Sequence, residues 1–157
     1  MTEARVASRE TVQGRRVFVV ALVLISMSLV GFLLALIFQW PSDFVLGDKP
    51  DSKVTPADFV PGTVTSIPLA PFAVLVVVTL LVRSRRWWGT LANVVLTLLG
   101  AVFVVGGLGE VTSDNPHVPK AVLVVAGATY VLLGLSLIFT GALDLVGRWR
   151  SRTHSTR

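Results

Sequence analysis

Four long stretches of apolar residues, separated by polar segments, dominate the pattern of this chain. Within each stretch the apolar positions run almost without interruption, whereas the segments of a water-soluble fold alternate or repeat along one helical face. About 20 consecutive apolar residues allow a helix to cross the ~30 Å hydrocarbon core of a bilayer. Because a backbone in lipid must satisfy its own hydrogen bonds, the runs are expected to be helical. The pattern predicts four transmembrane helices, at 17–39, 65–82, 88–108 and 121–146.

The remaining polar segments define the rest of the topology. We expect a tail at 1–16, a loop at 40–64, a turn at 83–87, a loop at 109–120 and a second tail at 147–157. The first apolar run exceeds the 7–15 residues or so that are typical of a signal peptide, so it is expected to be retained as a helix. The predicted fold class is an all-α membrane protein with four transmembrane helices and minimal soluble parts.

The basic residues divide unequally between the two sides of this topology. All eleven arginines flank the runs on one side, and the three lysines, Lys49, Lys53 and Lys120, lie on the other. Because Lys and Arg collect on the cytoplasmic side of a membrane, both termini are predicted to be cytoplasmic, in a plasma membrane. Tryptophans stand at the predicted span ends, where their rings prefer the headgroup level: Trp40, Trp87, Trp88 and Trp149.

Composition narrows the chemistry that this chain can perform. The chain has no cysteine, which excludes disulfides, thiolate metal sites, iron–sulfur clusters and cysteine nucleophiles. Its formal net charge is +5, but the basic residues follow the membrane topology, so the bilayer and not nucleic acid is the expected partner. We expect no catalytic, cofactor or metal-binding residues and no cofactor.

One segment of the chain recurs. Residues 62–77 and 109–125 align with one inserted residue as G-x-V-T-S followed by P-x-x-P-x-A-V-L-V-V. The recurrence predicts two helical hairpins in parallel orientation, a layout that is found in some transporters. The alternative is a repeated solution for beginning a helix, with Ser or Thr caps and Pro in the first turn.

The long loop contains a shorter repeat, at 41–47 and 56–62, which predicts two short turns or helices at the membrane surface. Thr55 is a suitable cap before Pro56, and Phe44 and Phe59 are expected to enter the interface. The loop carboxylates, Asp43, Asp48, Asp51 and Asp58, are of the type that binds a divalent cation. Their spacing matches no EF-hand loop, which favours helix-start and solvated carboxylates instead.

Small and polar residues within the runs predict close helix packing. The candidates are Ser28, Gly31, Ala35, Asn93, Thr97, Gly100, Gly107, Gly127, Gly134 and Gly141. Asp144 and Arg148 are expected to form an i,i+4 ion pair at the inner face.

These patterns favour a non-enzymatic membrane protein that acts through helix–helix contacts. It would be an accessory or assembly subunit with a membrane-protein partner, or a homo-oligomer. The alternative is a small carrier or channel for an ion or solute, although such a path normally carries an ionisable group near mid-membrane, which the runs lack.

Overall fold

The computed structural model describes residues 2–40, 54–60, 62–63, 65–84, 87–116 and 118–154. These residues form the α-helices α1 (Thr2–Phe38), α2 (Leu69–Leu81), α3 (Trp87–Thr112) and α4 (Lys120–His154), and the short 3-10 helix η1 (Pro56–Phe59). The described residues include no strand beyond an isolated bridge between Thr63 and Ser66. The predicted all-helical fold is confirmed.

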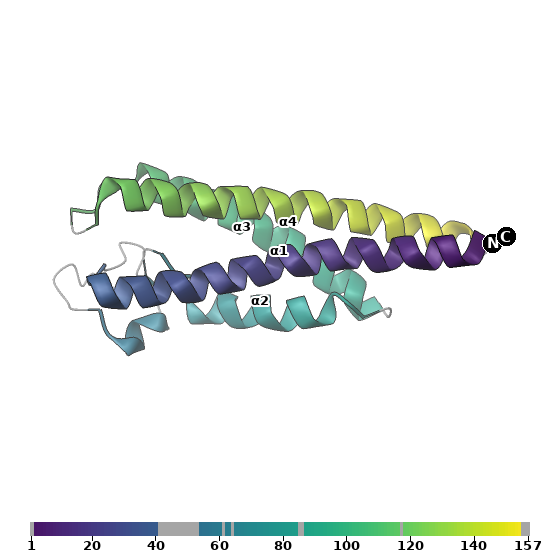
Figure 1. Ribbon diagram of the computed structural model, residues 1–157, viewed down its shortest axis with the longest axis horizontal. Coiled ribbons are helices and arrows are strands. Elements are labelled where there is room, and N and C mark those ends of the chain that lie inside the picture. The colour runs from purple at the N-terminus through teal and green to yellow at the C-terminus, as the bar shows by residue number, and fades with distance from the viewer. Residues whose placement is uncertain are drawn as a thin grey trace.

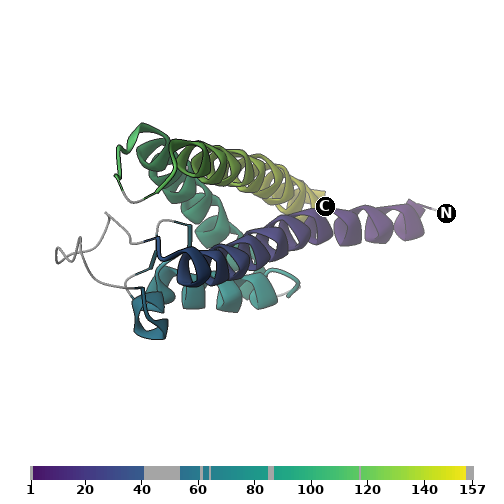
Figure 2. The same cartoon turned by 60° about the vertical axis from the view of Figure 1, so that its left-hand side comes forward.

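The helices form an elongated bundle in which successive helices run in opposite directions (Figures 1 and 2). Both chain termini lie at one end of the bundle, which we call the terminal end. The short helix η1 and the described residues 113–116 after α3 lie at the opposite end, which we call the loop end. The arginines of α1 and α4 therefore cluster toward the terminal end, away from Lys120.

Three of the helices are long and apolar enough to cross a membrane: Gly14–Phe38, Trp87–Thr112 and Lys120–Arg150. The helix in the second predicted span differs. α2 has 13 residues and is therefore about 20 Å long, short of the ~30 Å hydrocarbon core. It begins four residues later than the predicted start at 65, because Pro68 immediately precedes it and the preceding residues form a tight non-helical turn.

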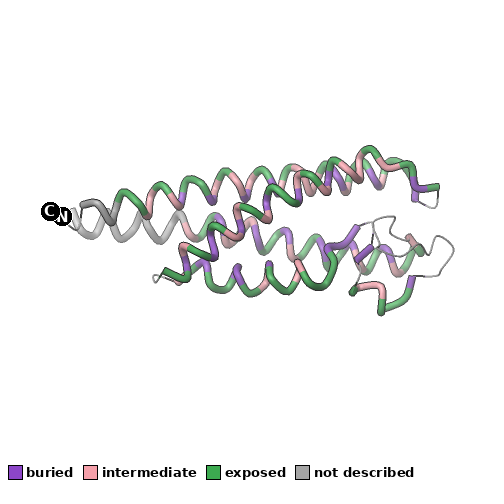
Figure 3. The backbone as a smooth tube through the Cα atoms, turned by 180° about the vertical axis from the view of Figure 1, so that it is seen from behind, coloured by how far each residue is buried: buried purple, intermediate pink, exposed green. Residues whose placement is uncertain are grey.

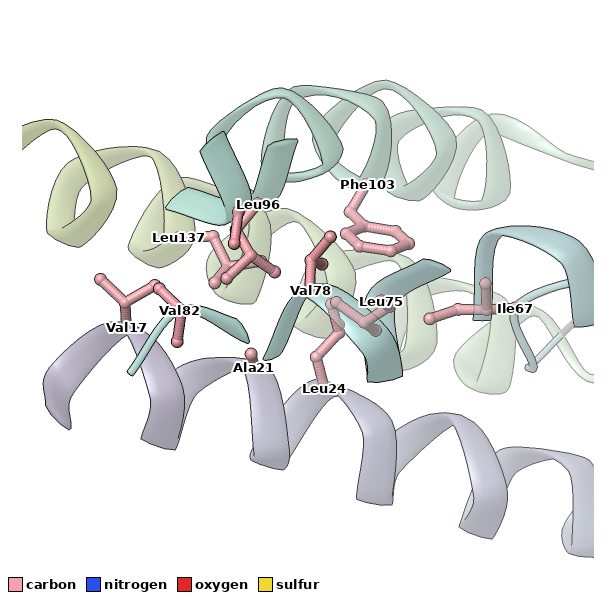
Figure 4. Packing of buried hydrophobic residues seen from close by; sticks show 11 residues of the cluster. Val17, Ala21, Leu24, Ile67, Leu75, Val78, Val82, Leu96, Phe103 and Leu137 are labelled. Carbon is pink, nitrogen blue, oxygen red and sulfur yellow. The ribbon is translucent and has the colours of Figure 1, made fainter. Parts of the chain in front are cut away.

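The buried core lies where α1, α2, α3 and α4 face one another (Figure 4). Val17, Ala21 and Leu24 repeat along one face of α1, and none of them is exposed. The other apolar residues of this cluster are Ile67, Leu75, Val78, Val82, Ala92, Leu96, Phe103 and Leu137. The outward faces of the helices remain apolar and exposed, as expected for helices that face lipid (Figure 3).

The second half of the long loop folds against the bundle. The carboxylate of Asp58 accepts hydrogen bonds from the backbone N–H and the hydroxyl of Thr55, and so fixes the start of η1. The Phe59 ring lies 4.8 Å from that of Phe32 on α1 and 5.5 Å from that of Phe72 on α2. The first half of this loop, with Phe44 and the acidic residues at 43, 48 and 51, lies outside the described residues.

The two recurring segments differ at their beginnings. Gly62 has a φ of 90° and precedes a non-helical turn, whereas its counterpart Gly109 lies inside α3. The second proline of each segment occupies a comparable position, since Pro71 lies in the first turn of α2 and Pro119 directly precedes α4. The duplication of a helical hairpin stays a prediction.

Candidate functional site

The closest helix contact is an antiparallel seam between α3 and α4, which carries glycines at steps of seven residues on both helices. A Cβ on Gly100 would lie 2.7 Å from the carbonyl oxygen of Gly134, and one on Gly134 would lie 2.6 Å from that of Gly100. The next pair along the seam, Gly107 and Gly127, is equally close. Any side chain at these positions would separate the backbones, so glycine sets the distance between the two helices.

At the next step toward the terminal end, the seam becomes polar. A Cβ on Gly141 would collide with the hydroxyl of Thr97 and lie 3.2 Å from Oδ1 of Asn93. The Nδ2 of Asn93 donates to the Gly141 carbonyl at 3.1 Å and to Oδ2 of Asp144 at 2.9 Å. The missing side chain at position 141 therefore provides the space in which an amide of α3 reaches a carboxylate of α4.

Asp144 is the acidic residue of this cluster and is only 2% exposed. Its Oδ2 accepts a second hydrogen bond from Nε of Arg148 at 2.7 Å, with the arginine side chain 23% exposed. A buried carboxylate is costly unless it is paired and hydrogen-bonded, and these two donors meet that requirement. Asp144 and Arg148, the predicted i,i+4 pair, are thus in contact and are more buried than an ordinary surface ion pair.

The guanidinium of Arg148 also joins α4 to the segment that follows α2. Its Nη2 donates to the Val82 carbonyl at 3.0 Å and its Nη1 to the Ser84 carbonyl at 3.4 Å. Val82 is the C-cap of α2, so the bond to its carbonyl satisfies an acceptor that the helix end leaves without an intrahelical donor. Because the same guanidinium holds Asp144, a single side chain links the end of α2 to the α3–α4 seam.

Within the described part of the terminal end, two buried oxygens have no hydrogen-bond partner, Oδ1 of Asn93 and Oγ1 of Thr90. They lie one helical turn apart on α3. A buried acceptor without a donor costs roughly 1–3 kcal/mol.

A second polar cluster joins α1 and α4 to the non-helical segment before α2. The Thr65 hydroxyl donates to the Gly31 carbonyl at 2.6 Å, and the Ile67 N–H donates to Oγ of Ser28 at 2.9 Å. From α4, the Tyr130 hydroxyl donates to the Thr65 carbonyl at 2.8 Å. Gly31 leaves room for this approach, because a Cβ there would collide with the Thr65 carbonyl.

This second cluster lies deep within the apolar helices. Ser28 is near the middle of the apolar stretch Gly14–Phe38. Tyr130 is ten residues, or about 15 Å, from the start of α4. The chain thus enters the bundle as irregular backbone and continues as α2 from mid-depth. Ser28 and Gly31, small residues of α1 that are candidates for helix packing, contact this irregular segment. Ala35 is also buried and lies one turn further toward the loop end.

The polar contacts at the loop end are of an ordinary surface kind. Nζ of Lys120 lies 2.8 Å from Oδ1 of Asp114, and both side chains are exposed. The hydrogen bond from Lys120 and its charge hold the pKa of the Asp114 carboxyl below its usual 3.8. Among the described residues no group of three or more His, Asp or Glu side chains is placed to hold a metal ion.

The sequence alone did not assign Thr65 or Ile67 a role in these contacts. Thr65 and Ile67 fall inside an apolar run that reads as continuous helix, and their partners on α1 and α4 are distant in sequence. Gly127, Gly134 and Gly141 recur every seven residues in the sequence. Their partners on α3 follow once the two helices are placed side by side in antiparallel register.

Comparisons of the chain with protein-family models, with curated proteins and with solved structures give no match.

Proposed function

We propose that this chain is a small integral membrane protein that acts through lateral contacts with another membrane protein or with a second copy of itself. Three long apolar helices support insertion in a membrane. The described polar groups at mid-depth form hydrogen bonds within the chain, and these bonds stabilise its own fold. The groups belong to Ser28, Gly31, Thr65, Ile67 and Tyr130.

The short second helix is the observation that carries this proposal. Irregular backbone at membrane depth is tolerated only where protein covers it or where it lines a water-filled cavity. α1 and α4 cover one side of the segment that precedes α2. Thr65, Ser66 and Ile67 of this segment are themselves buried. Beside them the surface is open where the segment meets α2, since Val60 is 61% and Leu69 38% exposed, and Pro68 and Ala70 are exposed as well. A helix of a partner would cover this surface, which we call the open flank.

Cysteine cross-linking tests this contact directly, because the chain has no native cysteine. We expect an Ala70→Cys variant, oxidised in native membranes, to form a defined disulfide with a second copy, or a defined adduct with one neighbour when the thiol carries a photo-crosslinker. Leu132→Cys is the matched control, because Leu132 is 66% exposed on α4 and lies close in sequence to Tyr130. Equal and unspecific labelling at both positions would contradict a contact at the open flank.

We further propose a plasma-membrane location with the terminal end in the cytoplasm. The support is the clustering of arginines toward that end and of Lys120 at the other. In intact cells, a membrane-impermeant maleimide should leave cysteines placed at either terminus unlabelled and should label one placed at Asp114. Labelling of either terminus from outside would reverse the orientation.

A carrier or channel is the second candidate, and the irregular segment at mid-depth favours it. Discontinuous helices of this kind form the substrate sites of several transporters. The buried Asp144, however, lies toward the terminal end and is paired with Arg148. Purified protein in liposomes should therefore pass ions no faster than empty liposomes do, and flux above that background would favour the carrier.

A further inference from the structure

A basic side chain of the segment after α2 contacts α1 at the terminal end of the bundle. The guanidinium carbon of Arg83 lies 5.2 Å from the centroid of the Phe18 ring, a distance typical of a cation–π contact. Arg15 precedes Phe18 by three residues and so lies on the same face of α1. Arg15, Arg16 and Arg83 are all exposed. We call Arg15, Phe18 and Arg83 the arginine site.

The depth of the arginine site matches the end of the apolar spans. Val17 and Val82 are neighbours of Arg16 and Arg83 in sequence, and both are fully buried in the same apolar cluster. In the sequence, the apolar run of α1 begins at Val17, directly after Arg15 and Arg16. The guanidinium groups are therefore placed at the boundary between apolar core and polar surface, where lipid headgroups lie in a bilayer.

The positive charge of the arginine site has no acidic counterpart in the described part of the terminal end. The acidic side chain described there is that of Asp144, and Oδ2 of this residue is already bonded to Arg148 and Asn93. In the whole sequence, the segments that flank the spans on this side contain eleven arginines against three acidic residues, Glu3, Glu10 and Asp144. An anion is the ligand that this charge distribution favours.

We propose that the arginine site binds the phosphate of an anionic phospholipid, with Arg15 and Arg83 as its two ligands. Guanidinium forms paired hydrogen bonds with phosphate oxygens, and the Phe18 ring fixes the orientation of one of the two groups. The exposed apolar side chains Leu22 on α1 and Leu81 on α2 continue from the site toward the membrane centre and suit an acyl chain. The inference rests on the proposed insertion in a bilayer and is independent of the partner at the open flank.

Native mass spectrometry of the full chain tests the site, after exchange into mixed phosphatidylglycerol and phosphatidylcholine nanodiscs. We expect one phosphatidylglycerol to remain bound after release from the disc. The Arg15→Gln/Arg83→Gln variant should retain it about 30-fold less, which corresponds to two basic contacts at an anionic membrane surface. Phe18→Leu, which keeps every charge, should show a smaller loss, because Arg83 is no longer held over a ring. Circular dichroism verifies that each variant is folded.

The control is Arg9→Gln/Arg152→Gln, which removes the same charge from the same side of the membrane outside the site. An equal loss of lipid in this control would show that net charge alone attracts the lipid and would overturn the site. Equal retention of phosphatidylcholine would overturn it as well, because that lipid has no net charge. Displacement of the bound lipid by millimolar inorganic phosphate would assign the site to soluble anions instead. None of these results bears on cross-linking at Ala70, so the two proposals fail separately.

Discussion

Replacing Gly100 with alanine is expected to loosen the α3–α4 seam. The added Cβ would lie 2.7 Å from the Gly134 carbonyl oxygen and 3.0 Å from Cγ1 of Ile138. An ordinary contact begins near 3.4 Å, so the helices must separate by roughly 0.7 Å at this point, and the two glycine pairs lose part of their packing. Overpacking of this kind costs about 1–3 kcal/mol. Because backbone faces backbone here, no side-chain rotation relieves the contact.

Gly106, on the same helix, provides the matched control. A Cβ there would meet no atom within 4 Å. Gly106→Ala should therefore leave the stability unchanged or raise it by up to about 1 kcal/mol through helix propensity. Reversible unfolding in mixed micelles with increasing SDS, followed by circular dichroism, measures both variants against the native chain. Because Gly100→Ala gains the same helix propensity, that gain cancels, and the expected difference between the variants is the packing cost of about 1–3 kcal/mol.

A double variant separates local strain from a general loss of fold. Once Gly100→Ala has moved the helices apart, Gly134→Ala should cost less than it does alone, because both methyl groups occupy the same interhelical space. Strict additivity of the two costs, or a Gly100→Ala variant as stable as Gly106→Ala, would refute the idea that this glycine pair sets the distance between the helices.

Three further predictions concern the polar contacts. Tyr130→Phe removes the hydrogen bond to the Thr65 carbonyl and should lower the stability by about 0.6 kcal/mol in the same SDS assay, while Tyr130→Ala should cost more. Arg148→Lys keeps the charge but loses the forked donors that reach the end of α2, so amide hydrogen exchange should accelerate there and not at the loop end. Because Lys120 depresses the pKa of Asp114, the pair contributes above pH 3.8 and is lost as the pH falls through the lower folded pKa. Lys120→Gln should return that pKa toward 3.8 in an NMR titration.

The three long helices follow directly from the sequence, because an uninterrupted apolar run in lipid has no alternative to helical hydrogen bonding. The second run does not fit that reasoning. Thr65, Ile67 and Pro68 belong to it by hydropathy, yet they form irregular backbone whose groups bond to α1 and α4. Hydropathy measures the cost of side chains in lipid and contains no information about which distant hydroxyl satisfies a backbone group.

The polar cluster at the terminal end shows the same limit. The spacing of Asp144 and Arg148 predicts that they can meet on one helix. It does not predict the contact of Arg148 with the Val82 carbonyl, which depends on where α2 ends relative to α4. Nor does the sequence indicate that Asp144 would be almost fully buried, since its burial follows from Gly141 and the approach of Asn93.

The antiparallel register of α3 and α4 links these observations along the length of the bundle. Steps of seven residues pair Asp114 with Lys120, then Gly107 with Gly127, Gly100 with Gly134, and Asn93 with Gly141. The seam thus runs from an exposed ion pair, through two glycine contacts, to a buried amide–carboxylate contact. A shift of seven residues would still place Gly100 opposite a glycine of α4, Gly127 or Gly141, but it would move Asn93 away from Asp144 and remove the donor that Asn93 supplies. Polar pairs at both ends therefore select one register, which glycine packing in the middle would not distinguish by itself, and this register places Arg148 where it can bond to the end of α2.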